Sequence, residues 1–288
     1  MQKITKAVIA VAGSGTRFLP ATKTIPKEML PIVDKPIVQY IVEELVDTGI
    51  KDIIMITTNA KKPLEDHFDI NTELEQQLLK AKKLDYLEQI KRVANLANYI
   101  YIRQKGPYGN GTPVLCAESV VGNEPFIYAF GDDLVKSKKS FTKQLLEEYE
   151  KNPGVIMGVQ KVAKKDISKY GIVGIKKGTK NQIEKIIEKP SVEEAPSDLA
   201  IFGRYILNSE IIKILKKQTL GKNNELWIAD AIDNYIKNGG LAYAKQTENG
   251  KWLTTGDPLN FLQATVEYAL DRNDLKYDFK KYLKQILK

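Results

Sequence analysis

The chain has 288 residues, of which 43% are hydrophobic and 28% are charged. A folded chain of this length buries about three quarters of its unfolded surface, and its composition excludes disordered, collagen-like and small disulfide-rich proteins. The 44 Lys and Arg residues outnumber the 36 Asp and Glu residues, which gives a formal net charge of +8. This excess is spread along the chain and favours a phosphate-bearing partner, but it does not distinguish a nucleotide from a nucleic acid.

The N-terminal segment MQKITKAVIAVAGSG has an apolar run too short for the h-region of a signal peptide followed by a small-residue cleavage site. The one cysteine, Cys116, cannot form a disulfide within the chain. No window approaches the roughly 18 consecutive apolar residues of a membrane span. We therefore expect a cytoplasmic protein that makes no contact with a membrane.

The first half of the chain repeats one pattern, in which a short β-branched apolar run is followed by a turn and a stretch of helical periodicity. Strands are predicted at residues 7–12, 52–58, 99–104 and 125–130. A helix is predicted over 36–48, and the long polar stretch 61–98 predicts two or three helices. This βαβ pattern indicates a Rossmann-like α/β fold, with a mixed, mainly parallel sheet flanked by helices.

The second half has short strands close together, without helices between them. These strands are predicted at residues 154–162, 170–175, 182–188 and 199–206, and helices return at 209–217 and 225–238. Because no repeat or low-complexity linker interrupts the chain, the pattern predicts one α/β domain with a small β-rich lobe.

The tail from 258 to 288 predicts a C-terminal segment of one or two helices. Its apolar residues recur every four positions, at Leu275, Phe279, Leu283 and Leu287. Such a stripe can pack on the core of its own chain or on another subunit, as in a homodimer or tetramer. The sequence leaves both arrangements open.

A glycine-containing loop follows the first predicted strand. It consists of Ala12, Gly13, Ser14, Gly15 and Thr16. Glycines allow backbone N–H groups to close around a phosphate chain. The loop lacks the third glycine of the dinucleotide fingerprint and the Gly-Lys-Ser/Thr ending of a P-loop, so both of these common assignments are disfavoured.

The residues after this loop make the pattern specific. Residues 13–23 read Gly-Ser-Gly-Thr-Arg-Phe-Leu-Pro-Ala-Thr-Lys, followed by Pro-Lys-Glu-Met-Leu-Pro at 26–31 and Asp-Lys-Pro at 34–36. In order and spacing this block resembles the sugar-1-phosphate nucleotidyltransferases, in particular the bacterial and archaeal branch of UTP:glucose-1-phosphate uridylyltransferases. Further segments extend the resemblance over nearly the whole chain; they are residues 67–75, 131–134, 170–171, 188–190 and 199–205.

The resemblance implies a reaction and its cofactor. An oxygen of glucose 1-phosphate would attack the α-phosphorus of UTP, giving UDP-glucose and pyrophosphate. Because this step brings two anions together, its catalysis depends on positioning and charge neutralisation. Arg17 and Lys27 would be the catalytic cations, and Asp132 would hold a Mg²⁺ ion.

The resemblance also implies the binding residues. UTP would bind at Ala12, Gly13, Ser14, Gly15 and Thr16, with Gln104 and Gly109 at the base. The sugar phosphate would meet Gly171, Glu188 and Lys189, where a carboxylate suits glucose hydroxyls because it only accepts hydrogen bonds. On this basis residues 1–135 form a nucleotide-binding half, 136–257 a sugar-phosphate-binding half and 258–288 the C-terminal helices.

Two segments depart from the family pattern. Where the family usually has Gly-Leu-Gly-His-Ala, this chain has Gly-Asn-Gly-Thr-Pro at 109–113, so the base preference is less secure than the reaction. Where relatives place an aspartate, this chain has Thr254, and Asp257 follows three positions later, directly before a proline. An Asp-Pro pair at this point predicts a helix N-cap. Asp133 is left open, as a backbone partner or as a support for the metal.

Other functions remain as alternatives. A thymidylyltransferase, or an enzyme for another sugar 1-phosphate, would use the same chemistry, although the helical insertion near 67–75 argues against the thymidylyl branch. A non-catalytic nucleotide- or RNA-binding protein would need basic clusters interleaved with aromatic residues, and the sequence has no such cluster. We therefore expect no nucleic-acid partner.

Overall fold

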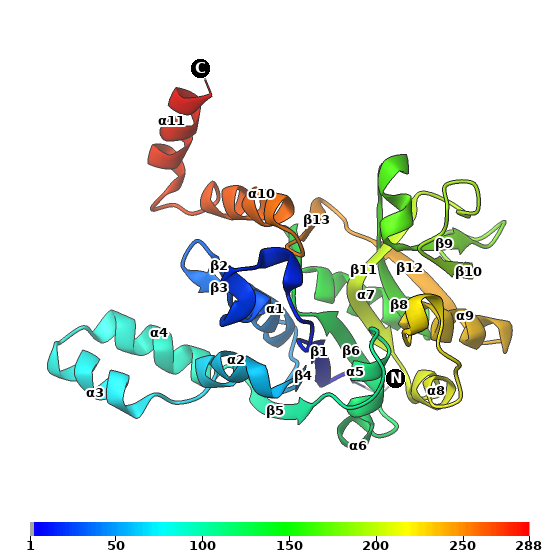
Figure 1. Cartoon of the computed structure of the whole chain (residues 1–288), viewed down its shortest axis with the longest axis horizontal. Helices are drawn as coiled ribbons and strands as arrows, with labels where there is room; N and C mark the ends of the chain where they lie inside the picture. The colour runs from blue at the N-terminus through cyan, green and yellow to red at the C-terminus, as the bar shows by residue number, and fades with distance from the viewer. Residues whose placement is uncertain (1–2, 288) are drawn as a thin grey trace.

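The computed structural model describes residues 3–287, so Met1, Gln2 and Lys288, at the ends of the predicted segments, lie outside it. A nine-stranded sheet runs through the molecule in the order β10-β9-β11-β6-β1-β4-β5, with β8 joined to β11 and β12 joined to β8. Helices cover this sheet on both faces (Figure 1). The expected α/β class with a flanked, mixed sheet is confirmed.

The first half contributes the parallel part of the sheet. Its strands match the four predicted ranges within two residues; they are β1 (Lys6–Ala10), β4 (Asp52–Thr57), β5 (Asn98–Arg103) and β6 (Phe126–Phe130). Pairings β6-β1, β1-β4 and β4-β5 are all parallel. The predicted helices are α1 (Ile37–Val46) and three more within 61–98, namely α2 (Lys62–His67), α3 (Thr72–Lys80) and α4 (Leu84–Ala94).

Most strands of the second half extend this sheet. Its strands are β8 (Val155–Lys161), β9 (Gly171–Ile175), β10 (Ile183–Glu188), β11 (Leu199–Leu207) and β12 (Ala242–Gln246). Strand β11 pairs antiparallel with β6, β8 and β9, and so joins the two halves. The β-rich half is therefore continuous with the parallel half.

Several elements were not expected from the sequence. They are α5 (Thr112–Cys116), α6 (Glu118–Val121), α7 (Phe141–Lys151), β12, two-residue strands β2 (Pro31–Ile32) and β3 (Lys35–Pro36), and a ribbon of β7 (Asp133–Ser137) with β13 (Gly250–Thr254). The expected helices after β11 are present as α8 (Ser209–Leu215) and α9 (Ile228–Lys237).

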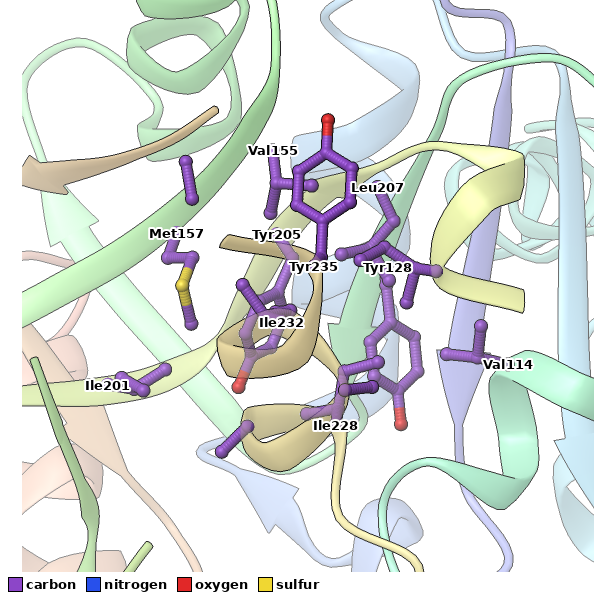
Figure 2. Packing of buried hydrophobic residues seen from close by; sticks show 14 of the residues in the cluster. Val114, Tyr128, Val155, Met157, Ile201, Tyr205, Leu207, Ile228, Ile232 and Tyr235 are labelled. Carbon is purple, nitrogen blue, oxygen red and sulfur yellow. The ribbon is translucent and has the colours of Figure 1, made fainter. Parts of the chain in front are cut away.

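The core lies on both faces of the sheet. In β1, Val8 faces one apolar cluster while Ala7 and Ile9 face the other, as the two-residue period of a strand requires. Figure 2 shows part of the first cluster, which brings together Ile228 and Ile232 of α9, Tyr128 of β6 and Tyr205 of the strand Leu199–Leu207. The second cluster is covered by α1, α7 and α10 (Pro258–Ala269).

The tail forms two helices, which agrees with the prediction of one or two helices over 258–288. Helix α10 contacts β13 and β2, whereas α11 (Lys276–Ile286) has no buried residue and extends away from the body of the molecule (Figure 1). Tyr277, Tyr282 and Ile286 of this helix are exposed, and so is Leu287, which directly follows it. Within residues 3–287, no helix is long and apolar enough to cross a bilayer.

Candidate active site

The carboxyl ends of the four parallel strands meet along one edge of the sheet. In the sheet, β4 lies on one side of β1 and β6 lies on the other, so the order in which the chain adds strands reverses at β1. Open α/β sheets bind their ligands at such a switch point. The residues expected to bind nucleotide or metal follow these strand ends: the 12–16 loop follows β1, Gln104 follows β5 and Asp132 follows β6.

A cavity of about 330 Å³ lies at this edge. Seven of the expected site residues line it: Ala12, Gly13, Ser14, Lys27, Gln104, Gly109 and Asp132. A neighbouring cavity of about 560 Å³ shares Ala12, Gly13, Ser14 and Gln104 with the first. The structure therefore brings together residues that are more than 100 positions apart in the sequence.

The phosphate loop is shaped around Lys27. Gly15 has a φ of 68°, a left-handed conformation that glycine adopts without steric cost, and its carbonyl accepts a 2.7 Å hydrogen bond from the Thr22 hydroxyl. A Cβ placed on Gly13 would lie 3.6 Å from the Lys27 ammonium. The Lys27 side chain therefore lies against the loop, and both line the 330 Å³ cavity.

Lys27 is paired with the carboxylate that follows β6. Its Nζ lies 2.5 Å from Oδ2 of Asp132, and both side chains are partly buried. Burial is the largest influence and opposes the charged form, but Asp132, Glu28 and Asp133 together outweigh it and raise the pKa of Lys27. The ammonium is therefore charged at neutral pH, as charge neutralisation of a triphosphate requires.

A second ion pair, not expected from the sequence, lies next to the first. Glu28 is 1% exposed and Lys61 is 6% exposed, and their charged atoms are 2.6 Å apart. Burial raises the pKa of Glu28 and lowers that of Lys61, while each charge favours ionisation of the other. Because Glu28 is adjacent in sequence to Lys27, this pair anchors the turn that carries Lys27. The sequence held one sign of this pair, because Lys61 closely follows the buried strand β4.

Asp133 points away from the cavity. Its Oδ2 accepts from the backbone N–H of Gly203 at 2.8 Å, and its Oδ1 accepts from the Trp252 indole at 2.9 Å. Burial, and next the charge of Asp132, raise the pKa of Asp133. The guanidinium of Arg204, fully buried, donates to the Asp133 carbonyl. Asp133 therefore anchors the turn, and Asp132 is the carboxylate of this pair that lines the cavity.

Arg17 lies near Asp132, beside Gly256. It lies in the 3₁₀ turn Thr16–Phe18, does not line the cavity, and donates to the Gly256 carbonyl at 3.3 Å. A Cβ placed on Gly256 would be 3.5 Å from the Arg17 guanidinium, from Asp132 Oδ2 and from the Thr254 hydroxyl alike. These three groups therefore converge on one glycine.

The donor set fits Mg²⁺ bound through one carboxylate. Within residues 3–287, no three His, Cys, Asp or Glu side chains gather as a metal cluster. Asp257 is a helix N-cap, as predicted, because its Oδ1 accepts from the Asn260 N–H at 3.1 Å. Mg²⁺ commonly takes one or two carboxylates, with phosphate oxygens and water completing its shell, and Asp132 offers one carboxylate beside the phosphate loop.

The three expected sugar-side residues come together at the end of the β9-β10 hairpin. Gly171 pairs with Glu188, and a Cβ at Gly171 would lie 2.8 Å from Glu188 Oε2, so only glycine leaves room for the carboxylate. Burial raises the pKa of Glu188 to about 7, although Lys189 opposes the shift. These residues do not line the 330 Å³ cavity. Their link to it is Trp227, which lines the cavity and lies under the Lys189 ammonium.

The altered loop at 109–113 is fixed to the start of α9. Gly109 has a φ of 120°, and a Cβ there would be 2.3 Å from the Leu226 carbonyl oxygen. The Asn110 side chain accepts from the Ile228 N–H at 2.8 Å. Pro113 lines the cavity. The glycine geometry of the loop is therefore required here, and the departure from the family pattern reaches the cavity wall.

The chain is similar to known proteins over most or all of its length. The family model described as nucleotidyl transferase matches residues 6–270. A UTP–glucose-1-phosphate uridylyltransferase of Bacillus subtilis (strain 168) is 43% identical over the whole chain and 98% of its own length. A UDP-glucose pyrophosphorylase complexed with UDP-glucose has a TM-score of 0.83 at 38% identity, covering 94% of this chain and 100% of that one. A UTP-bound UGPase from Acinetobacter baumannii has a TM-score of 0.88 at 35% identity, covering 98% and 99%.

Proposed function

The chain belongs to the nucleotidyl transferase family, and on that premise we propose that it transfers the uridylyl group of UTP to glucose 1-phosphate. The products are UDP-glucose and pyrophosphate. The observation that carries this proposal is the single cavity in which the phosphate loop, Lys27, Asp132 and Gln104 meet. A triphosphate and a second anion both need cations and backbone N–H groups at one place.

The chemistry is an in-line displacement. A phosphate oxygen of glucose 1-phosphate forms a bond to the α-phosphorus of UTP, and the bond from that phosphorus to the pyrophosphate oxygen breaks. No protein nucleophile is needed, because the attacking oxygen is already an anion. Lys27 and Arg17 would neutralise the triphosphate and the charge that develops on the leaving pyrophosphate.

Asp132 would hold Mg²⁺ beside the phosphates, where the ion supplies positive charge to the reacting phosphoryl group. The contact of Lys27 Nζ with the Asp132 carboxylate supports this role, because it holds the lysine beside the proposed metal ligand. The paired, buried Glu28 and Lys61 keep the Lys27 turn in position.

The division of the chain into halves remains part of the proposal. Residues 1–135 would bind UTP, with the backbone of Ala12 and Gly13 and the amide of Gln104 at the uracil. Residues 136–257 would bind the sugar phosphate, with Lys189 at the phosphate and Glu188 at the glucose hydroxyls. The pairing of β11 with β6 supports a fixed geometry between the two sites, because one sheet carries both.

The proposed reaction is tested by identifying its products. Purified protein with UTP, glucose 1-phosphate and MgCl₂ is followed by ³¹P NMR. We expect UDP-glucose and pyrophosphate to appear in equal amounts, and added pyrophosphate to drive the reaction backward. Release of UMP or of inorganic phosphate, or unchanged substrates, would contradict the proposal.

A second candidate is the same transfer from dTTP. The observation in its favour is the 109–113 loop, because Pro113 lines the cavity where relatives of this pattern have alanine. The three helices α2, α3 and α4 within 61–98 favour the uridylyl branch, as the sequence resemblance implied. Competition between UTP and dTTP separates the two candidates.

We also propose that the protein acts in the cytoplasm as a homo-oligomer, a dimer or tetramer. The unburied helix α11, with exposed Ile286 and Leu287, supports an intermolecular contact. Light scattering of the full chain and of Leu283→Glu tests this contact. The variant is expected to have the lower mass, and a monomeric parent protein would contradict the oligomer.

A further inference from the structure

Lys189 is held in an uncommon backbone conformation. Its φ is 47°, in the left-handed region that residues other than glycine seldom adopt. Its N–H donates to the Tyr170 carbonyl at 3.1 Å, and its own carbonyl accepts from the Lys222 ammonium at 2.8 Å. The backbone is thus fixed on both sides. The side chain, however, still has four rotatable bonds.

Trp227 fixes the end of that side chain. The Lys189 ammonium lies 4.0 Å from the centre of the indole ring, within the range of a cation–π interaction. The ammonium is also 3.9 Å from the Glu188 carboxylate. The charge of Lys189 is therefore held near both an aromatic face and an anion.

Trp227 is itself held rigidly. It is 7% exposed, and its indole N–H donates to the Lys222 carbonyl at 2.9 Å. Its own carbonyl accepts from the Gln218 amide at 3.0 Å, directly before α9 begins. Lys222 therefore bonds to Trp227 through its carbonyl and to Lys189 through its ammonium, which closes a ring of three residues. Trp227 also lines the 330 Å³ cavity, so the ring connects the hairpin end with that cavity.

We propose that Trp227 is a positioning residue for glucose 1-phosphate, which acts by holding the Lys189 ammonium at the edge of the cavity. This proposal rests on the proposed function, in which Lys189 meets the sugar phosphate. Without the indole face, the lysine side chain samples other rotamers. The entropy cost of ordering it then reduces the free energy of substrate binding. Trp227 thus sets the affinity for the sugar phosphate and leaves the nucleotide site unchanged.

The first test compares Michaelis constants for the two substrates. Trp227→Leu keeps an apolar side chain but removes the ring, and we expect it to raise the KM for glucose 1-phosphate roughly threefold to tenfold, the worth of a partly exposed cation–π contact. The KM for UTP should change less than twofold. Trp227→Phe keeps an aromatic face and should restore most of the lost affinity. Tyr277→Leu removes a cation–π contact with Lys276 on α11 and is the matched control, with no expected change.

The second test is a double-mutant cycle with Lys189→Met. If Trp227 acts through Lys189, then Trp227→Leu has little further effect on the KM for glucose 1-phosphate once Lys189 is replaced. Equal effects of Trp227→Leu in both backgrounds would overturn the proposal, because the indole would then act on the substrate or the fold directly. A matching rise in the KM for UTP would also overturn it.

The same cycle is measured in urea, which needs no activity. We expect the shifts in unfolding midpoint for Trp227→Leu and Lys189→Met to be non-additive, because the two side chains share one contact. Non-additive unfolding together with failure of UTP and glucose 1-phosphate to react would show that the proposed substrates are wrong while the contact stands. Additive unfolding midpoints would overturn the positioning role itself.

Discussion

The proposed nucleotide side and the proposed sugar side of this site are built differently. On the nucleotide side, the charged groups follow the ends of buried parallel strands, and Lys27 and Asp132 neutralise each other directly. On the sugar side, Glu188 and Lys189 lie at the end of an antiparallel hairpin and depend on a loop contact to Trp227. On the proposed function, the strand ends would hold charges where charge develops in the reaction, and the hairpin end tied to a loop would provide recognition of the sugar. We therefore expect damage on the first side to reduce kcat and damage on the second to raise KM.

The largest effect is expected from removing the cations of the nucleotide side. Lys27→Ala and Arg17→Ala should each lower kcat by a factor on the order of 10² or more, because each removes charge that stabilises the transition state. Steady-state kinetics with saturating substrates measures this, with circular dichroism as the check of folding. Lys62→Ala, an exposed lysine of α2, is the control. Near-normal kcat in both variants would disprove the assignment of this side.

Asp132→Asn should reduce the rate about as strongly, because it keeps the shape of the side chain and removes the charge proposed to hold Mg²⁺. The rate is measured across a series of MgCl₂ concentrations. We expect that no physiological concentration restores it. Full activity at such a concentration would place the metal on other residues.

On the sugar side, Glu188→Ala should raise the KM for glucose 1-phosphate roughly tenfold to a hundredfold, the worth of one or two charge-assisted hydrogen bonds. Its effect on the KM for UTP should be small. The two Michaelis constants are determined in separate titrations at fixed saturating partner. If both rose equally, the proposed division between the two sides would fail at this residue.

The buried carboxyl of Glu188 should also make sugar binding depend on pH. Its pKa is raised to about 7, so the group is mainly protonated at pH 6 and mainly ionised at pH 8. The ionised form accepts more hydrogen bonds from hydroxyls, so the KM for glucose 1-phosphate should fall severalfold over this interval. The phosphate of the substrate titrates in an overlapping pH range, with a pKa of about 6. The Glu188→Gln variant separates its contribution from that of Glu188. An unchanged pH profile in Glu188→Gln would assign the whole dependence to the substrate.

The smallest effect concerns Asp257, which caps α10 and stands apart from both sides. Asp257→Ala should lower the free energy of unfolding by about 1 kcal/mol, the usual cost of losing an N-cap. The Mg²⁺ concentration for half-maximal rate should stay nearly unchanged. A large increase in that concentration at normal thermal stability would instead make Asp257 a metal ligand.

The nucleotide side was largely predictable from the sequence because its information is local. Val8 and Ile9 mark a buried strand, and the glycines directly after it mark the phosphate loop. What the sequence did not give was pairing over long distances. The β7-β13 ribbon joins Asp133 to Thr254, and fully buried Arg204 supports the Asp133 carbonyl, although arginine is usually exposed.

On the proposed sugar side, the sequence predicted individual residues but not the contacts that hold them in place. Glu188 and Lys189 were identified by resemblance, and the structure does bring them together with Gly171. Trp227 was missed because an aromatic residue before a helix gives no sign of a lysine 38 positions earlier in the chain. The ring of Trp227, Lys222 and Lys189 exists only through tertiary contacts, so no periodicity or motif could have shown it.

The most direct test of the account is a pyrophosphate-release assay over a grid of nucleoside triphosphates and sugar 1-phosphates. We predict that UTP with glucose 1-phosphate gives the highest kcat/KM. A tenfold preference over dTTP corresponds to about 1.4 kcal/mol, little more than one hydrogen bond to a ribose hydroxyl. A clear preference for dTTP, or for another sugar 1-phosphate, would contradict the account.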